Sequence, residues 1–229
     1  MTSTAIVGST GLVGSSILST LLTHPSITTI SSLSRRAPST TDPKLTPLID
    51  ADSSQWPSKL SSLTPPPSIF FSALGTTRAA AGSLAGQRAI DYDLNLSLAQ
   101  AAKAAGVKTY VLISTSGASP TSPLAYPKMK GELEEAVKAL NFEKTIILRP
   151  GLIVGAREES RPAEWVVRKI AGAMGTVANG LKDFWAQDAG VIAKAAVSAG
   201  LKAEKGEGEK VWTVGQAEIV RLGRTEWKV

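Results

Sequence analysis

A tyrosine and a lysine four residues apart, Tyr126 and Lys130, could carry acid–base chemistry. On a helix this spacing places both side chains on one face. A phenol with its usual pKa of about 10 is a poor base at neutral pH unless a nearby cation lowers that pKa. Ser114 and Thr115 follow an apolar run and could supply a hydroxyl to hold a carbonyl oxygen. Together these groups would suit hydride transfer beside a nicotinamide, with Thr115 or Ser114, Tyr126 and Lys130 as catalytic residues. The alternative is an amphipathic tyrosine at a helix end and a solvated lysine.

The first turn of the chain, Gly8-Ser-Thr-Gly-Leu-Val-Gly14, lies between an apolar run and an amphipathic stretch. Gly8 permits a tight turn, Gly11 lets the backbone approach a pyrophosphate, and Gly14 lets a helix pack closely on a strand. The helix N-terminus then offers unpaired N–H groups to an anion. The turn therefore predicts dinucleotide binding, with contacts from Gly8, Ser9, Thr10, Gly11, Leu12, Val13 and Gly14.

The next predicted strand, residues 27–33, ends in Ser34-Arg35-Arg36 instead of an acidic residue. Two guanidinium groups could clasp a 2′-phosphate, so the predicted cofactor is NADP(H) rather than NAD(H). The alternative is a pair of solvated loop arginines. Asp52 could reach the adenine edge, could cap the short helix that follows, or could do both.

Two later strand ends complete the predicted nucleotide site. The apolar strand 69–74 leads into small residues at the edge of the sheet where ligands of doubly wound folds bind, although a plain turn would look similar. The strand 145–148 ends in Arg149-Pro-Gly. The further predicted contacts are Leu74, Gly75, Thr76, Thr77, Arg78, Tyr126, Lys130, Pro150 and Gly151.

Strands and helices alternate along the first 150 residues, which predicts an α/β fold of the Rossmann type, a doubly wound parallel sheet. Further strands are predicted at 4–7, 45–49 and 110–113, with helices near 12–22, 54–60, 90–105 and 126–140. We expect one domain over residues 1–229, with a core in 1–150 and a cap on the substrate side in 151–229. That cap would hold helices at 160–173 and 188–202 and an edge strand at 211–214.

Composition excludes several classes of protein. A hydrophobic fraction of 43% with 19% charged residues argues against disorder. The absence of cysteine excludes thiol catalysis and disulfides, and the single histidine, His24, argues against a histidine metal site or a serine–histidine triad. The net charge of +6 is scattered, which disfavours nucleic acid as a partner. No apolar run reaches the roughly 18 residues of a membrane span, and the early first strand leads us to expect no cleaved presequence.

The helix expected after Ser160 has an apolar side flanked by cations. That side could contact an anionic membrane surface peripherally, or it could pack on the domain or on a second subunit of a homo-oligomer. Its residues are Trp165, Val166, Val167, Ile170 and Met174, with Arg161, Arg168 and Lys169 nearby.

These motifs resemble the short-chain dehydrogenase/reductase superfamily in its atypical branch. Three stretches are similar to one subfamily, that of the fungal FMP-type proteins of the mitochondrial outer membrane and the vertebrate Tat-interacting proteins. They are Ala73-Leu-Gly-Thr-Thr-Arg78, Lys128-Met-Lys-Gly-Glu132 and Glu158-Glu-Ser-Arg-Pro-Ala-Glu-Trp-Val-Val-Arg-Lys169. The likeness covers roughly residues 5–203. Pro127 departs from the superfamily pattern and places Tyr126 in the first helical turn.

The resemblance implies an NADPH-binding Rossmann fold with Thr115 or Ser114, Tyr126 and Lys130 in the catalytic positions. It also implies peripheral association with the cytosolic face of the mitochondrial outer membrane. Two functions follow as alternatives: an oxidoreductase that reduces a small carbonyl compound, or an NADPH-responsive regulatory protein without catalysis. The expected partners are a nicotinamide dinucleotide and an unidentified small molecule.

Overall fold

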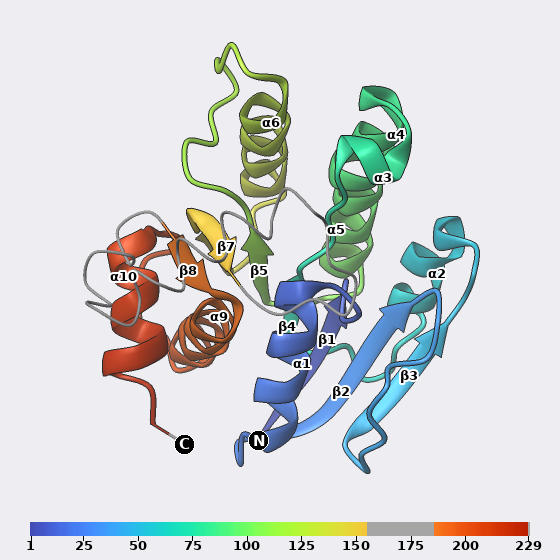
Figure 1. Cartoon of the computed structure of the whole chain (residues 1–229). Coiled ribbons are helices and arrows are strands. Elements are labelled where there is room, and N and C mark those ends of the chain that lie inside the picture. The colour runs from blue at the N-terminus through green and yellow to red at the C-terminus, as the bar shows by residue number, and fades with distance from the viewer. Residues whose placement is uncertain (155–185, 229) are drawn as a thin grey trace.

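Seven parallel strands form the central sheet of the computed structural model, which describes residues 1–154 and 186–228 (Figure 1). Their order is β3-β2-β1-β4-β5-β6-β9, so the chain winds outward from β1 in one direction and from β4 in the other. The strands are β1 (Thr2–Val7), β2 (Ile27–Ser34), β3 (Leu45–Ile49), β4 (Ile69–Ser72), β5 (Thr109–Ile113), β6 (Lys144–Leu148) and β9 (Val211–Val214). This confirms the predicted Rossmann-type α/β fold.

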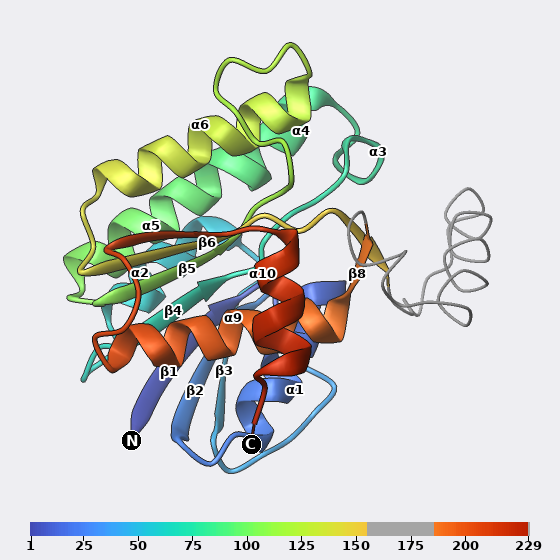
Figure 2. The ribbon, with the colours of Figure 1, turned by 90° about the vertical axis from the view of Figure 1, so that its left-hand side faces the viewer.

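Helices cover both faces of the sheet. In Figure 2, α5 (Asn95–Ala104) and α6 (Ala125–Ala139) lie on one side of the strands, and α1 (Leu12–Thr23) and α9 (Ala189–Glu204) lie on the other. Alternation along the strands explains the two layers: Ile6 packs with the α1 and α9 side chains, whereas its neighbours Ala5 and Val7 pack with those of α5, α6 and α2 (Trp56–Ser61).

Short elements fill the connections. A 3-10 helix (Ser53–Gln55) precedes α2, and α3 (Arg78–Ala81), α4 (Leu84–Arg88) and a π-helix (Ala89–Leu94) lead from β4 into α5. A second sheet pairs β7 (Leu152–Val154) with β8 (Ala186–Asp188), and α10 (Gln216–Val220) continues into a π-helix (Arg221–Thr225).

The largest difference from the sequence prediction lies between β4 and α5. The expected helix 90–105 is the last part of a broken helical segment, because Gly82 (φ +77°) separates α3 from α4 and the Ser83 side chain caps α4. The strand expected to reach residue 74 ends at Ser72, since Ala73 and Leu74 leave the sheet for the next turn.

The C-terminal part of the chain also contributes to the core. Strand β9 pairs with β6, and α9 packs on α1 with Ile192, Ala193 and Ala196 fully buried. The core therefore extends beyond residues 1–150. The helix expected at 160–173, with its apolar side around Trp165, lies outside the described residues.

Candidate nucleotide-binding and proton-transfer site

The glycine turn at the end of β1 has no space for side chains at two of its three glycines. Gly8 adopts φ +80°, and a Cβ there would lie 2.5 Å from the Ala73 carbonyl oxygen. A Cβ on Gly14 would lie 2.0 Å from the Gly8 oxygen. These approaches let the turn lie against the end of β4 and let α1 pack beside β1.

The same turn leads into a helix end without a side-chain cap. Helix α1 begins after Gly11, whose N–H donates to the Gly8 carbonyl at 2.9 Å. Because β1 and β4 lie where the winding of the sheet reverses, this helix end faces the edge at which doubly wound folds bind ligands.

Not every predicted contact of the turn has its side chain on this edge. The Ser9 hydroxyl is buried and lies 2.7 Å from the Ser32 hydroxyl, and Val13 packs in the core. Thr10 is exposed and Leu12 is half-buried. Ser9 and Val13 can therefore offer a ligand only their backbone.

Arg35 and Arg36 lie directly after β2 and are exposed. The Ser34 hydroxyl donates to the Arg36 carbonyl at 2.7 Å, which shapes this corner. Within the described chain, neither guanidinium group forms an ion pair with a carboxylate. Asp52 caps the short 3-10 helix through the Ser54 N–H at 2.9 Å, and hydrogen bonding from the Ser54 side chain and backbone lowers the pKa of its carboxyl.

The turn after β4 contains Leu74, Gly75, Thr76, Thr77 and Arg78. Thr77 caps α3 by accepting the Ala80 N–H at 3.2 Å, and Arg78 is exposed. A Cβ on Gly8 would also lie 2.8 Å from the Leu74 nitrogen, so this turn and the glycine turn are in contact.

Buried polar side chains that the sequence reasoning did not assign hold this turn in place. Asn95 donates to the Leu74 carbonyl at 3.3 Å, and Asp91 accepts the Thr76 N–H at 2.6 Å. Gln87 donates to the Thr76 carbonyl at 3.2 Å. Gln87, Asp91 and Asn95 are spaced four residues apart after an apolar strand. This spacing was the signal in the sequence that could have placed them on one helix face.

Ser114 and Thr115 at the end of β5 have different surroundings. Ser114 is buried, and its hydroxyl donates to Glu134, which is fully buried on α6. Arg149 pairs with the same carboxylate, with Nε lying 3.1 and 3.2 Å from the two oxygens. Thr115 is half-buried next to this cluster. The hydroxyl of Ser114 is thus engaged in the fold, and Thr115 is the better placed candidate for a ligand contact.

Tyr126 and Lys130 lie in α6, whose first turn carries Tyr126 as predicted. Lys130 is buried, and its Nζ donates to the Ile113 carbonyl at 3.0 Å. Burial lowers the pKa of Lys130, while the charges of Asp91 and Glu134 raise it. Tyr126 is 41% exposed, and its pKa is raised to about 12 by loss of solvent and by the Asp91 charge. Burial and Asp91 account for this shift in the pKa of Tyr126, and the expected lowering by Lys130 stays a prediction.

Pro150 and Gly151 follow β6. The Pro150 carbonyl accepts the Ser116 N–H at 2.7 Å, and the Gly151 N–H donates to Gln187 at 2.7 Å. Gln187 in turn lies 3.1 Å from Gln216, which donates to the Ser116 hydroxyl at 3.1 Å. These two glutamines, also unassigned from the sequence, join the ends of β5 and β6 to the second sheet.

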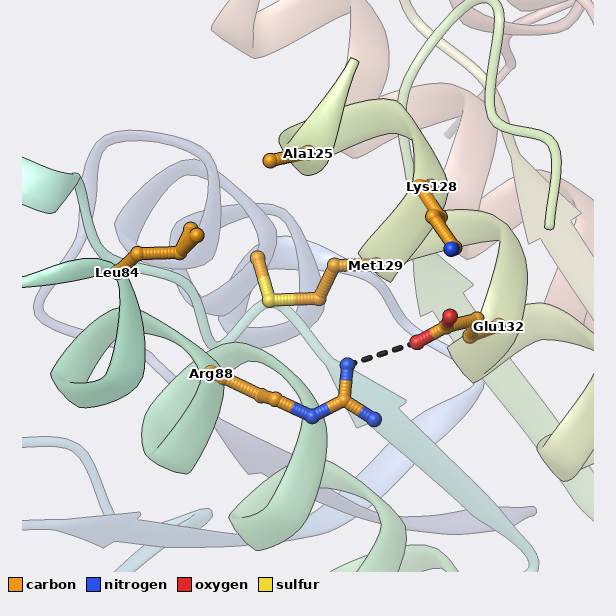
Figure 3. A pocket seen from close by; sticks show the side chains of 6 residues that line it. All are labelled: Leu84, Arg88, Ala125, Lys128, Met129 and Glu132. Atoms are coloured by element: carbon orange, nitrogen blue, oxygen red, sulfur yellow. Dashed lines mark hydrogen bonds and ion pairs between the residues drawn. The ribbon is translucent and has the colours of Figure 1, made fainter. Parts of the chain in front are cut away.

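A shallow groove of about 220 Å³ lies between α4 and α6 (Figure 3). Arg88 and Glu132 cross it as an ion pair of 2.7 Å, and the Arg88 guanidinium also stacks on Tyr92 at 4.3 Å. Its lining residues are Leu84, Arg88, Ala125, Lys128, Met129 and Glu132, and none of them is a predicted site residue.

Taken together, the parallel sheet and the glycine turn at its centre define a Rossmann-type α/β domain, along which the Ser/Thr, Tyr and Lys positions follow in the order read from the sequence. Solved structures agree on the fold. The enzyme WbmH of Bordetella bronchiseptica, determined in complex with NAD+, has a TM-score of 0.67 at 18% identity, over 93% of this chain and 75% of that one. A UDP-N-acetylglucosamine 4-epimerase of Methanobrevibacter ruminantium has a TM-score of 0.69 at 17% identity, over 93% and 76%.

Curated relatives are much closer in sequence. "Protein fmp52-1, mitochondrial" of Aspergillus terreus is 56% identical over 98% of this chain and 100% of its own length. "Protein fmp-52, mitochondrial" of Neurospora crassa is 49% identical over 99% of this chain and 97% of its own. The HIM1 family model matches residues 67–173. The chain belongs to the FMP52 family.

Of the helices in the described ranges, none is long and apolar enough to span a bilayer.

Proposed function

We propose that this protein binds NADPH at the carboxyl edge of its sheet and reduces a small carbonyl compound there. The observation that carries the proposal is the glycine cradle, in which Cβ atoms at Gly8 and Gly14 would collide with backbone, beside a helix end without a side-chain cap. These features fit a dinucleotide pyrophosphate. The NAD+ complex of the structural neighbour WbmH supports the same ligand class.

The preference for NADPH rests on Arg35 and Arg36. Their exposed guanidinium groups follow the strand next to the glycine turn, where a 2′-phosphate would need cations. Contacts to the rest of the nucleotide would come from the turn at Leu74–Arg78, from Lys130 and from the Pro150-Gly151 corner.

The chemistry requires a hydride and a proton. A bound reduced nicotinamide would supply the hydride to the carbonyl carbon. Thr115 would hold the carbonyl oxygen, and Tyr126 would give that oxygen its phenolic proton, since a pKa of about 12 keeps the phenol protonated at neutral pH. Lys130 would stabilise the phenolate that remains.

A regulatory role without turnover is the second candidate. It is favoured by the Lys130 ammonium, which is buried and donates to the Ile113 carbonyl. In that case NADPH would bind and change a partner surface without being oxidised.

Titration calorimetry with NADPH and NADH tests the cofactor proposal. We expect tighter binding of NADPH, and Arg35→Ala and Arg36→Ala should each weaken it about 10- to 100-fold while leaving NADH binding unchanged. Lys108→Ala is the matched control, because this exposed cation lies next to the amino end of β5, at the opposite edge of the sheet. Equal affinities for both nucleotides would refute the NADPH preference.

Turnover separates the two candidate functions. NADPH oxidation with a panel of aldehydes and ketones should be lost in Tyr126→Phe, with nucleotide affinity retained. If the wild type binds NADPH but reduces no carbonyl compound, and Tyr126→Phe behaves identically in every assay, the regulatory role replaces catalysis.

We also propose a peripheral position on the cytosolic face of the mitochondrial outer membrane. The mitochondrial designation of the relatives supports the organelle, and the family resemblance supports the membrane. Protease accessibility in intact mitochondria together with release by carbonate would be expected. Protection from protease in intact organelles would contradict it.

A further inference from the structure

Asp91 is a buried carboxylate that has no role in either of the two proposed functions. It is 1% exposed and lies in the π-helix between α4 and α5. A buried carboxylate is costly unless hydrogen bonds and nearby positive charge satisfy it, and π-helical turns are frequent at functional positions.

One set of Asp91 contacts leads to the nucleotide side of the site. Its Oδ1 accepts the Thr76 N–H at 2.6 Å, and a Cβ on Gly75 would lie 3.9 Å from the same oxygen. Gln87 lies 3.5 Å from Oδ2 and holds the Thr76 carbonyl, so one carboxylate and one amide fix both polar groups of the Thr76 backbone.

Asp91 also lies beside α6, because the π-helix that carries it packs on that helix. Helix α6 carries both Tyr126 and Lys130. The Asp91 charge raises the pKa of Tyr126 and supports the ammonium form of buried Lys130. Glu134 is the other carboxylate that acts on Lys130, whereas Arg88 pairs with Glu132 on the groove side.

We propose that Asp91 is a positioning residue that ties the turn carrying Thr76 to the Tyr126–Lys130 face of α6. The same carboxylate holds the turn that carries Thr76 and sets the electrostatic surroundings of Tyr126 and Lys130. A change at Asp91 therefore affects both parts of the proposed site. The part that concerns nucleotide affinity rests on the proposed function, and the part that concerns Tyr126 does not.

Two substitutions separate the two roles. Asp91→Asn removes the charge but keeps an oxygen that can accept the Thr76 N–H, whereas Asp91→Ala removes both. Asp93→Asn is the matched control, because Asp93 lies in the same π-helix but is exposed. Carbon NMR of ring-labelled tyrosine follows the ionisation of Tyr126, assigned with Tyr126→Phe, and amide hydrogen exchange follows the Thr76 N–H.

In Asp91→Asn we expect the pKa of Tyr126 to fall by about 0.5 to 1 from its value in the wild type, with Thr76 still protected from exchange. In Asp91→Ala we expect the same fall, faster exchange at Thr76 and roughly tenfold weaker NADPH binding. Asp93→Asn should match the wild type in all three measurements.

An unchanged Tyr126 titration in Asp91→Asn overturns the inference, and so does wild-type protection of Thr76 in Asp91→Ala. Both measurements are made without nucleotide. If the wild-type protein binds no NADPH, the proposed function is refuted. The Tyr126 titration and the Thr76 exchange would still test the role of Asp91.

Discussion

Arg149, directly after β6, donates from its Nε to both carboxylate oxygens of the fully buried Glu134 on α6, at 3.1 and 3.2 Å. The Ser114 hydroxyl donates to the same carboxylate from the end of β5. Glu134 thus joins two strand ends to the helix that carries Tyr126 and Lys130. Glu134 is fully buried and so cannot contact a ligand. It nevertheless helps to fix the position of the helix that carries Tyr126 and Lys130, which the proposed chemistry needs.

Replacing Glu134 should therefore destabilise the fold. We expect Glu134→Gln to cost about 3 kcal/mol of unfolding free energy, at the low end for a broken buried pair because the Arg149 side chain retains 32% exposure. Urea denaturation measures the loss. Glu135→Gln is the control, since Glu135 is 57% exposed in its ion pair with Lys138 and should cost less than about 1 kcal/mol. Equal effects of both changes would contradict the assigned role.

Ser114 and Thr115 should separate stability from activity. Ser114→Ala removes a donor to buried Glu134 and should cost about 1–2 kcal/mol while nucleotide binding persists. Thr115→Val keeps the shape and removes the hydroxyl, so carbonyl reduction should fall at nearly constant stability. Thermal unfolding and NADPH oxidation, measured on both variants, test this. A stable Ser114→Ala variant with lost turnover would reverse the assignment.

Local patterns in the sequence were sufficient for most of the fold. The β-branched run at Ile27 and the glycine turn at Gly8 each depend on neighbours within a few residues, and these elements lie where they were predicted. The short helices α3 and α4 were not predicted, because four and five residues are too few to show a helical period. The three-residue strands β7 and β8 carry too little pattern to be recognised.

The site could be predicted in its motifs but not in its contacts. That Ser114 faces Glu134 and that Lys130 donates to the Ile113 carbonyl depend on how α6 lies across β5. Asp91 and Gln187 were missed for the same reason, since their partners Thr76 and Gly151 are distant in sequence. Residue type and spacing name candidates, whereas burial decides whether a polar side chain serves the fold or a ligand.

The only histidine should report on a contact between the two ends of the chain. His24 ends α1, lies 5.8 Å from the ring of Trp227, and has a pKa lowered from 6.5 by burial and by the charges of Lys44 and Lys205. The unfolded chain then binds more protons just below pH 6.5, so the His24 contribution to stability is complete above that pH and is lost as the pH falls.

Proton NMR of the imidazole should therefore give a pKa below 6.5. Urea denaturation of the wild type should show lower stability at about pH 5.5 than at 7.5, and His24→Gln should reduce that difference. An imidazole that titrates at or above its ordinary value would contradict the lowered pKa.

The glycine turn gives the sharpest test of the nucleotide site. Gly14 and Gly190 both lie in the first turn of a helix, but a Cβ on Gly14 would meet the Gly8 oxygen at 2.0 Å, whereas a Cβ on Gly190 would meet no atom within 4 Å. Alanine at Gly14 must push α1 away from the turn, so we expect a loss of about 1–3 kcal/mol in stability and a loss of nucleotide binding. Alanine at Gly190 should instead stabilise α9 by roughly 0.5 kcal/mol and leave binding unchanged.

Chemical denaturation and nucleotide titration of both variants measure these effects. A Gly14→Ala protein that binds NADPH as tightly as the wild type would mean that the nucleotide, if bound, does not depend on this turn.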